Sequence, residues 1–156
     1  MKQTRPDLHH RNQDGDVDRP LDDHTEVIES NPDDPLAYLD RGAARLKVCC
    51  YDGAIADFNK ALELNPCCTA AYTGRGSVYY DKAIHEHCDE ALFQQAIADF
   101  TKAIDIDPKS ALAYCNLGWT YEEIGEEQKA VACYLKALQI DPSLEAARDN
   151  LTLLGR

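Results

Sequence analysis

Basic residues and long apolar runs are both scarce in this sequence. Sixteen Lys and Arg residues stand against 28 Asp and Glu residues among the 156, which gives a formal net charge of −12. Because nucleic acids and anionic membrane surfaces attract basic proteins, this charge argues against either as a partner. No stretch reaches the roughly 18 consecutive apolar residues that a membrane-spanning helix needs, so we predict no membrane partner.

Sequence patterns of enzymes are missing as well. The chain contains no glycine-rich phosphate loop, no nucleophile elbow around a serine, and no His-Glu-x-x-His pattern. The His-Glu-His run at positions 85–87 does not by itself form a catalytic group. We therefore predict that the protein is not an enzyme and uses no cofactor.

Cysteine is abundant, but its pattern does not indicate disulfides. The seven cysteines are odd in number, and residues 1–18 lack the apolar core of a secretory signal. Disulfide-rich scaffolds occur mainly in secreted proteins with paired cysteines. The sequence therefore predicts reduced thiols and a cytoplasmic protein, with Cys115 and Cys133 as small apolar residues inside helices.

One pattern occurs three times along the chain. Each copy has an aromatic residue four positions before a glycine, an alanine four positions before a second aromatic residue, and a final proline after Asp or Asn. Pro32, Pro66, Pro108 and Pro142 are 34, 42 and 34 residues apart, and such a period is typical of stacked helix–turn–helix units. Small residues would let the two helices of a unit approach closely, while large rings fill the space between units. These positions are Gly42, Gly76 and Gly118; Ala54, Ala96 and Ala130; and Phe58, Phe100 and Tyr134.

This pattern resembles that of the tetratricopeptide repeat (TPR) family over residues 35–144. The resemblance implies an all-α, right-handed α-solenoid of three helix–turn–helix TPR units, because no single unit can bury its apolar face alone. An N-terminal half-repeat and a C-terminal capping helix with a polar outer face would close the two ends. The predicted segments are a disordered acidic tail (1–20), the half-repeat or capping helix (21–34), TPR 1 (35–68), TPR 2 (69–110), TPR 3 (111–144) and the capping helix (145–156).

The second unit is irregular, because it is eight residues longer than the other two. The excess falls near residues 83–93, and eight residues are close to two turns of helix. We expect each helix of this unit to gain about one turn, so that a hairpin projects from one edge of the solenoid. Insertions in repeat arrays often contribute specificity.

Charged residues occupy internal positions of the first two units. Asp57 and Lys60, and likewise Asp99 and Lys102, are three residues apart, which predicts solvated ion pairs on an outer face. Some arginines replace apolar residues of the repeat pattern, and we expect their stems to pack while the guanidinium groups reach acidic neighbours. These are Arg41, Arg45 and Arg75.

The resemblance also implies a concave groove, lined by the first helix of each unit, that binds an extended or helical peptide. Trp119, the single tryptophan, is a candidate anchor for a partner; alternatively, it packs against Tyr80 and the last helix. Asn116 stands where many members of the family place an asparagine that holds peptide backbone. The predicted groove residues are Leu39, Asp40, Ala43, Thr73, Ser77, Tyr80, Asp81, Cys115, Asn116, Trp119 and Glu122.

Charge in this groove indicates the kind of partner. The basic residues with which chaperone-binding members hold a terminal carboxylate are replaced by Leu39, Ala43, Gly74 and Leu112. We therefore predict a non-catalytic adaptor or scaffold that binds a protein or peptide with basic and apolar residues. The acidic residues that favour such a partner are Asp40, Asp81, Glu122 and Glu123.

Two other functions remain open at this point. One is a self-associating scaffold that forms a homo-oligomer, and the other is a metal- or redox-responsive edge where the turns of adjacent units meet. Cysteine and histidine are suitable zinc or copper ligands, but the spacing matches no zinc motif. Our primary prediction is therefore that the protein has no metal site. The candidates at this edge are Cys49, Cys50, His85, His87 and Cys88.

Overall fold

The computed structural model describes residues 19–86 and 88–155, and within them all regular structure is helical. The predicted tail before residue 19, together with His87, lies outside the described residues. No helix in the described ranges is both long and apolar enough to cross a bilayer. The helices, which confirm the all-α prediction, are α1 (Arg19–Ser30), α2 (Pro35–Lys47), α3 (Tyr51–Leu64), α4 (Thr69–His85), α5 (Glu90–Ile106), α6 (Ala111–Glu123), α7 (Glu127–Ile140) and α8 (Glu145–Leu153).

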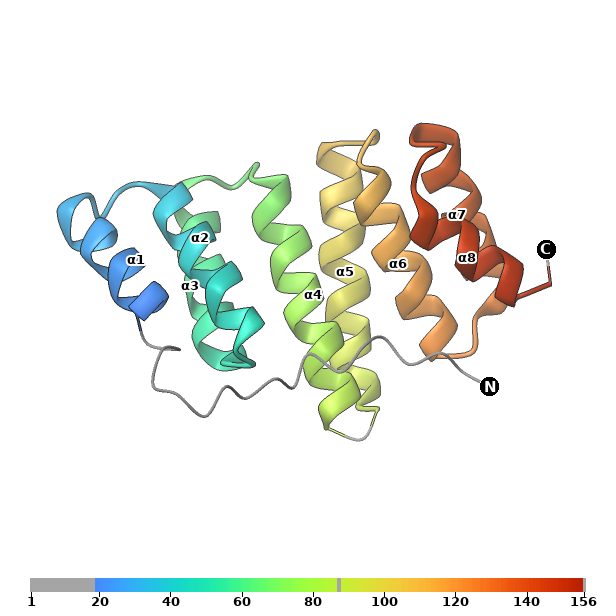
Figure 1. Cartoon of the computed structure of the whole chain (residues 1–156), viewed down its shortest axis with the longest axis horizontal. Coiled ribbons are helices and arrows are strands. Elements are labelled where there is room, and N and C mark those ends of the chain that lie inside the picture. Colours follow the sequence, from blue (N-terminus) through green and yellow to red (C-terminus); the bar gives the residue numbers. More distant parts are fainter. Residues whose placement is uncertain (1–18, 87, 156) are drawn as a thin grey trace.

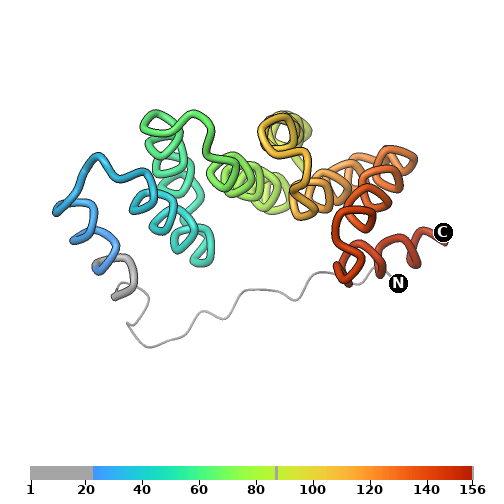
Figure 2. The backbone as a smooth tube through the Cα atoms, turned by 90° about the horizontal axis from the view of Figure 1, so that it is seen from above, coloured from blue at the N-terminus to red at the C-terminus, as the bar shows by residue number. Residues whose placement is uncertain are grey.

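Consecutive helices pack against each other in one row, which Figure 1 shows from blue α1 to red α8. The row is curved: in Figure 2, α2, α4 and α6 lie on its inner side, and α3, α5 and α7 on its outer side. Helix α4 also contacts α2 and α6 directly. The helices thus form stacked pairs, α2–α3, α4–α5 and α6–α7, as expected for an α-solenoid.

The large rings, which were expected to fill the space between units, lie between the two helices of their own pair. Phe58, Phe100 and Tyr134 are at most 1% exposed. A Cβ atom added to Gly118 would lie 2.6 Å from Cε1 of Tyr134, and one added to Gly76 would lie 2.8 Å from Cε1 of Phe100. Because the interior is closely packed, any larger side chain at these positions would displace the ring.

Gly74 makes a contact that the repeat pattern did not predict. A Cβ atom there would lie 2.6 Å from Cζ of Phe58, which belongs to the preceding helix pair. The ring of Phe58 is thus held between Gly42 of its own pair and Gly74 of the next. Gly74 is therefore a packing position between units.

The turn after each outer helix is held by a short side chain that bonds the backbone two residues later. Asp141 accepts a hydrogen bond from the backbone N–H of Ser143 at 2.9 Å and another from its hydroxyl. These bonds, the hydroxyl first, lower the pKa of Asp141. Such turns explain why Asp or Asn precedes the proline in each copy. The other two turns join Asn65 to the N–H of Cys67 at 3.2 Å and Asp107 to the N–H of Lys109 at 3.0 Å.

The α4–α5 hairpin is longer than its neighbours and projects beyond them in Figure 1. Both helices have 17 residues, whereas the other paired helices have 13 or 14. The added turns are packed: Phe93 is 2% exposed, and Nζ of Lys82 donates to Asp52 of α3 at 2.8 Å. The extra residues thus lengthen both helices, as expected from the sequence, and rest on the start of α3.

The predicted outer-face ion pairs Asp57–Lys60 and Asp99–Lys102 are wrong. Asp57 and Asp99 are only 3% and 6% exposed. Asp99 accepts hydrogen bonds at 2.7 Å from both Nε and Nη2 of Arg75 on α4. A helix register that points each aspartate toward its inner helix explains this, because three-residue spacing on α3 and α5 places the lysines further round toward solvent.

The arginines are structural, as predicted, and Arg41 and Arg75 each join three helices. Arg41 donates to both carboxylate oxygens of Asp57, at 3.0 and 2.7 Å, and also to the hydroxyl of Thr25 on α1. Arg75 similarly donates to Asn59 on the preceding outer helix. The hydrogen bond to Asp99 raises the pKa of Arg75. Arg45 adds a third contact to Asp57, at 2.7 Å.

The third helix pair replaces both members of this ion pair together. Leu117 occupies the position of Arg75, and Cys133 that of Asp99. Both lie in an apolar cluster with Phe100, where burial raises the pKa of the Cys133 thiol to about 11. Since a buried charge without its counter-charge is strongly destabilising, a joint replacement is the arrangement that preserves packing.

Helix α8 closes the C-terminal end of the row. Ala147 and Leu151 are buried against the preceding pair. Thr152 is exposed and stands 34 residues after Gly118, at the position where the paired inner helices have glycine. The capping role of α8 therefore stays a prediction, with which an exposed threonine at this position is compatible.

Candidate partner-binding surface

Parallel stripes of side chains run along the three inner helices. Each stripe contains a residue near the helix start and the residues seven and eleven positions later, which two and three turns bring to the same side. On α2, Arg41 and Arg45 lie about half a turn from this stripe and reach Asp57 on the outer helix, so the stripe faces the inner side. The inner stripes are Leu36, Ala43 and Lys47 on α2; Ala70, Ser77 and Asp81 on α4; and Leu112, Trp119 and Glu123 on α6.

The inner stripes begin in an apolar row near the helix starts. Leu36 and Leu112 are 60% and 55% exposed, and exposed Ala70 occupies the same position on the helix between them. A single exposed leucine is ordinary. Two at equivalent positions of one curved surface, however, offer apolar area that a partner can cover.

The stripes end in charged residues, which are acidic on α4 and α6. The Tyr80 hydroxyl donates to Glu123 at 3.5 Å, and the Tyr134 hydroxyl donates to Glu122 at 2.8 Å. Burial, and then the bond to Glu122, raises the pKa of Tyr134. Sequence reasoning missed this bond; the signal was a tyrosine where the other units have phenylalanine, since a buried hydroxyl needs a partner.

Helix α2 differs from the other two inner helices in charge. Its stripe ends in exposed Lys47, and exposed Asp40 lies beside the stripe. The acidic end of the surface is therefore on α4 and α6. Lys82, one residue beyond the α4 stripe, is paired with Asp52 and Glu86.

A small pocket lies between the apolar and acidic ends. It is lined by Ser77, Tyr80, Phe100, Asn116 and Trp119. The side-chain amide of Asn116 donates to Ser77 at 3.5 Å, and Asn116 is only 7% exposed. The structure thus brings these predicted residues together, while the action of Asn116 on partner backbone stays a prediction.

Trp119 has one face in the core and another on the pocket. It is half-buried and packs against a cluster that includes Tyr134 of α7 and Leu151 of α8. This packing agrees with the alternative prediction for Trp119, in which its ring packs against Tyr80 and the last helix. Its role as an anchor for a partner therefore concerns only the part of the ring that lines the pocket.

The other predicted groove residues divide into exposed and enclosed ones. Ala43 is exposed, and Asp81 is half-buried. Leu39 packs partly against the core around Phe58, and the Thr73 hydroxyl donates to the carbonyl of Thr69 at 2.9 Å. Cys115, at 0% exposure, belongs to the core, because its position on α6 faces α7 and α8; its predicted place in the groove is corrected.

Thiol labelling checks this correction. With iodoacetamide at neutral pH we expect the exposed thiols of Cys50, Cys67 and Cys88 to react first, and Cys115 and Cys133 to stay unlabelled in the folded protein. Only an accessible thiolate reacts; Cys115 is buried, and Cys133 is half-buried with a thiol pKa raised to about 11. Peptide mass spectrometry measures the labelling of each site, with urea-unfolded protein as the control. Labelling of Cys115 at the same rate as Cys50 would show that Cys115 is exposed at the surface and would contradict the correction.

The turn cysteines do not assemble a metal centre with the described residues. Among these, no group of three or more His, Cys, Asp or Glu side chains is placed to hold a metal ion. His85 instead packs its ring 5.6 Å from that of Tyr51. Burial, and then a hydrogen bond with the Cys49 thiol, raises the pKa of Tyr51. His87, a further candidate ligand, lies outside the described residues.

The stacked helix pairs and the inner stripes define a helical repeat protein of the solenoid class. A profile described as "Tetratricopeptide repeat" matches residues 111–144, and one described as "TPR repeat" matches residues 93–125. Together with the stacked helix pairs, these matches show tetratricopeptide repeats over residues 93–144.

One curated protein and two solved structures illustrate what the chain is similar to. "Protein SGT1 homolog" of Oryza sativa subsp. japonica is 38% identical over 64 residues, which cover 41% of this chain but only 17% of that protein. A crystal structure of MamA superimposes with a TM-score of 0.70 at 28% identity, covering 85% of this chain and 73% of MamA. The first TPR of Spaghetti (RPAP3), bound to the HSP90 peptide SRMEEVD, has a TM-score of 0.69 over 78% of this chain and 90% of that one, and at 21% identity it shares the fold alone.

Proposed function

We propose that this protein is a non-catalytic adaptor, or scaffold, that binds a segment of another protein on its inner surface. The observation that carries the proposal is the apolar row, in which Leu36 and Leu112 are 60% and 55% exposed at equivalent positions. Burial of a leucine side chain contributes roughly 1.5–3 kcal/mol relative to full exposure. The seven cysteines are free thiols, which supports a cytoplasmic site of action.

The charge of the surface favours a basic partner segment. The peptide held by the RPAP3 domain, SRMEEVD, carries two Glu residues and one Asp. Here Asp81 and Glu123 end the inner stripes of α4 and α6, with Glu122 beside Glu123. An acidic peptide would meet like charges there, which disfavours binding. We therefore infer that the partner combines Lys or Arg with apolar residues.

Peptide selection tests this proposal. A displayed library of random 12-residue peptides would be selected on the immobilised protein, and the Kd of the recovered peptides measured by fluorescence anisotropy. We expect a variant with both Leu36→Ser and Leu112→Ser to bind them at least about tenfold more weakly, since tenfold corresponds to 1.4 kcal/mol. Both leucines are exposed, so this variant should keep the circular dichroism spectrum of the wild type.

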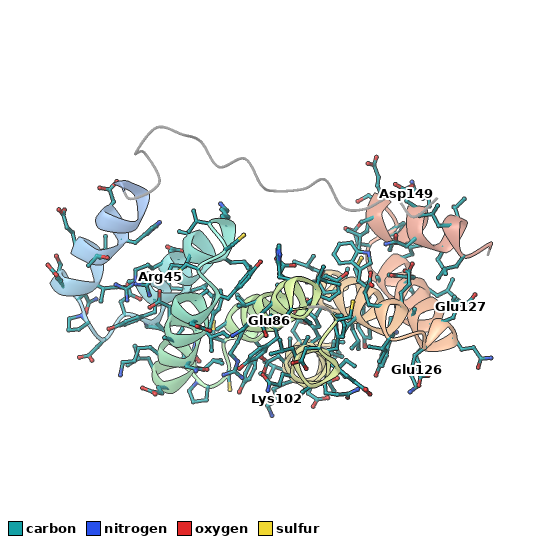
Figure 3. The ribbon with its side chains drawn as sticks, turned by 90° about the horizontal axis from the view of Figure 1, so that it is seen from below. Arg45, Glu86, Lys102, Glu126, Glu127 and Asp149 are labelled. Atoms are coloured by element: carbon teal, nitrogen blue, oxygen red, sulfur yellow. The ribbon has the colours of Figure 1, made fainter. Side chains whose placement is uncertain are left out.

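The matched control is Lys102→Ala. Lys102 lies on α5, and Figure 3 shows it on the opposite side from Asp149 of α8. We expect Lys102→Ala to bind the selected peptides as the wild type does. Peptides that bind the leucine variant and the wild type equally would place the interaction elsewhere and contradict the proposal.

A further inference from the structure

We propose that the inner surface selectively binds extended partner segments in which an aliphatic and a basic residue are separated by a particular distance. This inference rests on the proposed function and adds a geometric rule to it. The aliphatic residue would cover Leu112 at the start of α6, and the basic residue would lie over Glu123 at the end of the α6 stripe.

The rule follows from the length of the α6 stripe. Leu112 and Glu123 are eleven residues apart on one side of a continuous helix, and a rise of 1.5 Å per residue separates them by about 16 Å. An extended chain covers roughly 3.3 Å per residue. A segment that lies along the stripe therefore spans the two ends with about five residues.

The two ends of the α6 stripe differ in exposure and charge, so each end suits a different side chain of the partner. Leu112 is 55% exposed, and the equivalent position on α4, next to it, holds the small residue Ala70, so an aliphatic side chain has apolar contacts on two helices. At the other end Glu123 is exposed, and its carboxylate is held by the Tyr80 hydroxyl of α4. The C-terminus of α6 adds the negative end of its helix dipole, which also favours a cation.

Two cations near this end, among the residues that the structure describes, are paired with other carboxylates. Lys82 is held by Asp52 at 2.8 Å and lies 3.8 Å from Glu86, and Lys129 pairs with Glu126 at 3.3 Å. Lys47 ends the stripe of α2, and so the sign of the charge changes across the row from α2 to α4 and α6. We therefore place the basic residue of the partner over Glu123 at the end of α6.

Designed peptides test the spacing. The probes are acetylated, amidated and fluorescently labelled peptides in which a Leu-Leu pair and a Lys-Lys pair are separated by Ser and Gln, with Leu-to-Lys distances of two, five, eight and eleven residues. We expect the distance of five to give a Kd at least about tenfold lower than the others in anisotropy titrations. A second probe set replaces Lys with Glu and is expected to bind at least about tenfold more weakly.

Two charge-reversed variants locate the basic contact. Glu123→Lys is expected to abolish the preference for Lys over Glu peptides, whereas Glu127→Lys, the same change at the start of α7 (Figure 3), is expected to preserve it. Peptides that bind at the leucine row with no optimum at five residues, or with no loss in Glu123→Lys, would overturn the spacing rule and leave the proposed function standing. If no selected or designed peptide depends on Leu36 and Leu112, the proposed function fails, and the rule with it.

Discussion

Replacing Arg75 with leucine should lower the free energy of unfolding by about 3 kcal/mol, because it removes the partner of a buried carboxylate. Asp99 is 6% exposed and receives two charged hydrogen bonds from Arg75. Asp99→Cys alone should also destabilise, since it leaves the guanidinium group, whose side chain is 20% exposed, without its counter-charge. Urea unfolding followed by circular dichroism gives each value.

The double variant, Arg75→Leu with Asp99→Cys, tests whether the two side chains stabilise the protein as a pair. It copies into the second helix pair the leucine and cysteine that the third pair already uses at Leu117 and Cys133. We expect it to recover at least half of the summed loss of the two single variants, because contacting residues do not contribute additively. Lys102→Ala on the outer surface serves as the control. A loss equal to the sum of the single losses would mean that the two side chains act independently.

Replacing Gly118 with alanine should destabilise the protein by about 1–3 kcal/mol, although alanine favours helix by up to 1 kcal/mol where a helix is exposed. The added methyl would lie 2.6 Å from the ring of Tyr134, which is fully buried and has its hydroxyl bonded to Glu122. The ring therefore has little freedom to move away. Chemical denaturation measures the change.

The three equivalent glycines provide a graded comparison for this effect. The nearest ring atom lies 2.6 Å from the added Cβ at Gly118, 2.8 Å at Gly76 and 3.1 Å at Gly42. We expect the cost of the alanine substitution to fall in that order, and Gly42→Ala to be nearly neutral. A stabilised Gly118→Ala variant would show that the helices can separate without loss, against the tight packing described here.

The sequence alone determined the architecture, because local, periodic features of the chain specify a repeat fold. The spacing of Gly118 and its counterparts predicted where the two helices of a pair approach closely, whereas the large rings, expected between units, also pack within their own pair. The eight additional residues of the second unit predicted two longer helices. Each of these inferences depends on the helical period and on side-chain size, both of which can be read along the chain.

Contacts between helices were decided only by the tertiary structure. The three-residue spacing of Asp57 and Lys60 is equally compatible with a solvated pair and with an aspartate turned inward, and only the position of Arg41 on the neighbouring helix selects the second. Cys115 was assigned to the groove from its repeat position, yet the packing of α7 and α8 encloses it. Burial and ion pairing depend on which helices meet and at what angle, and this geometry is a property of the assembled row of helices.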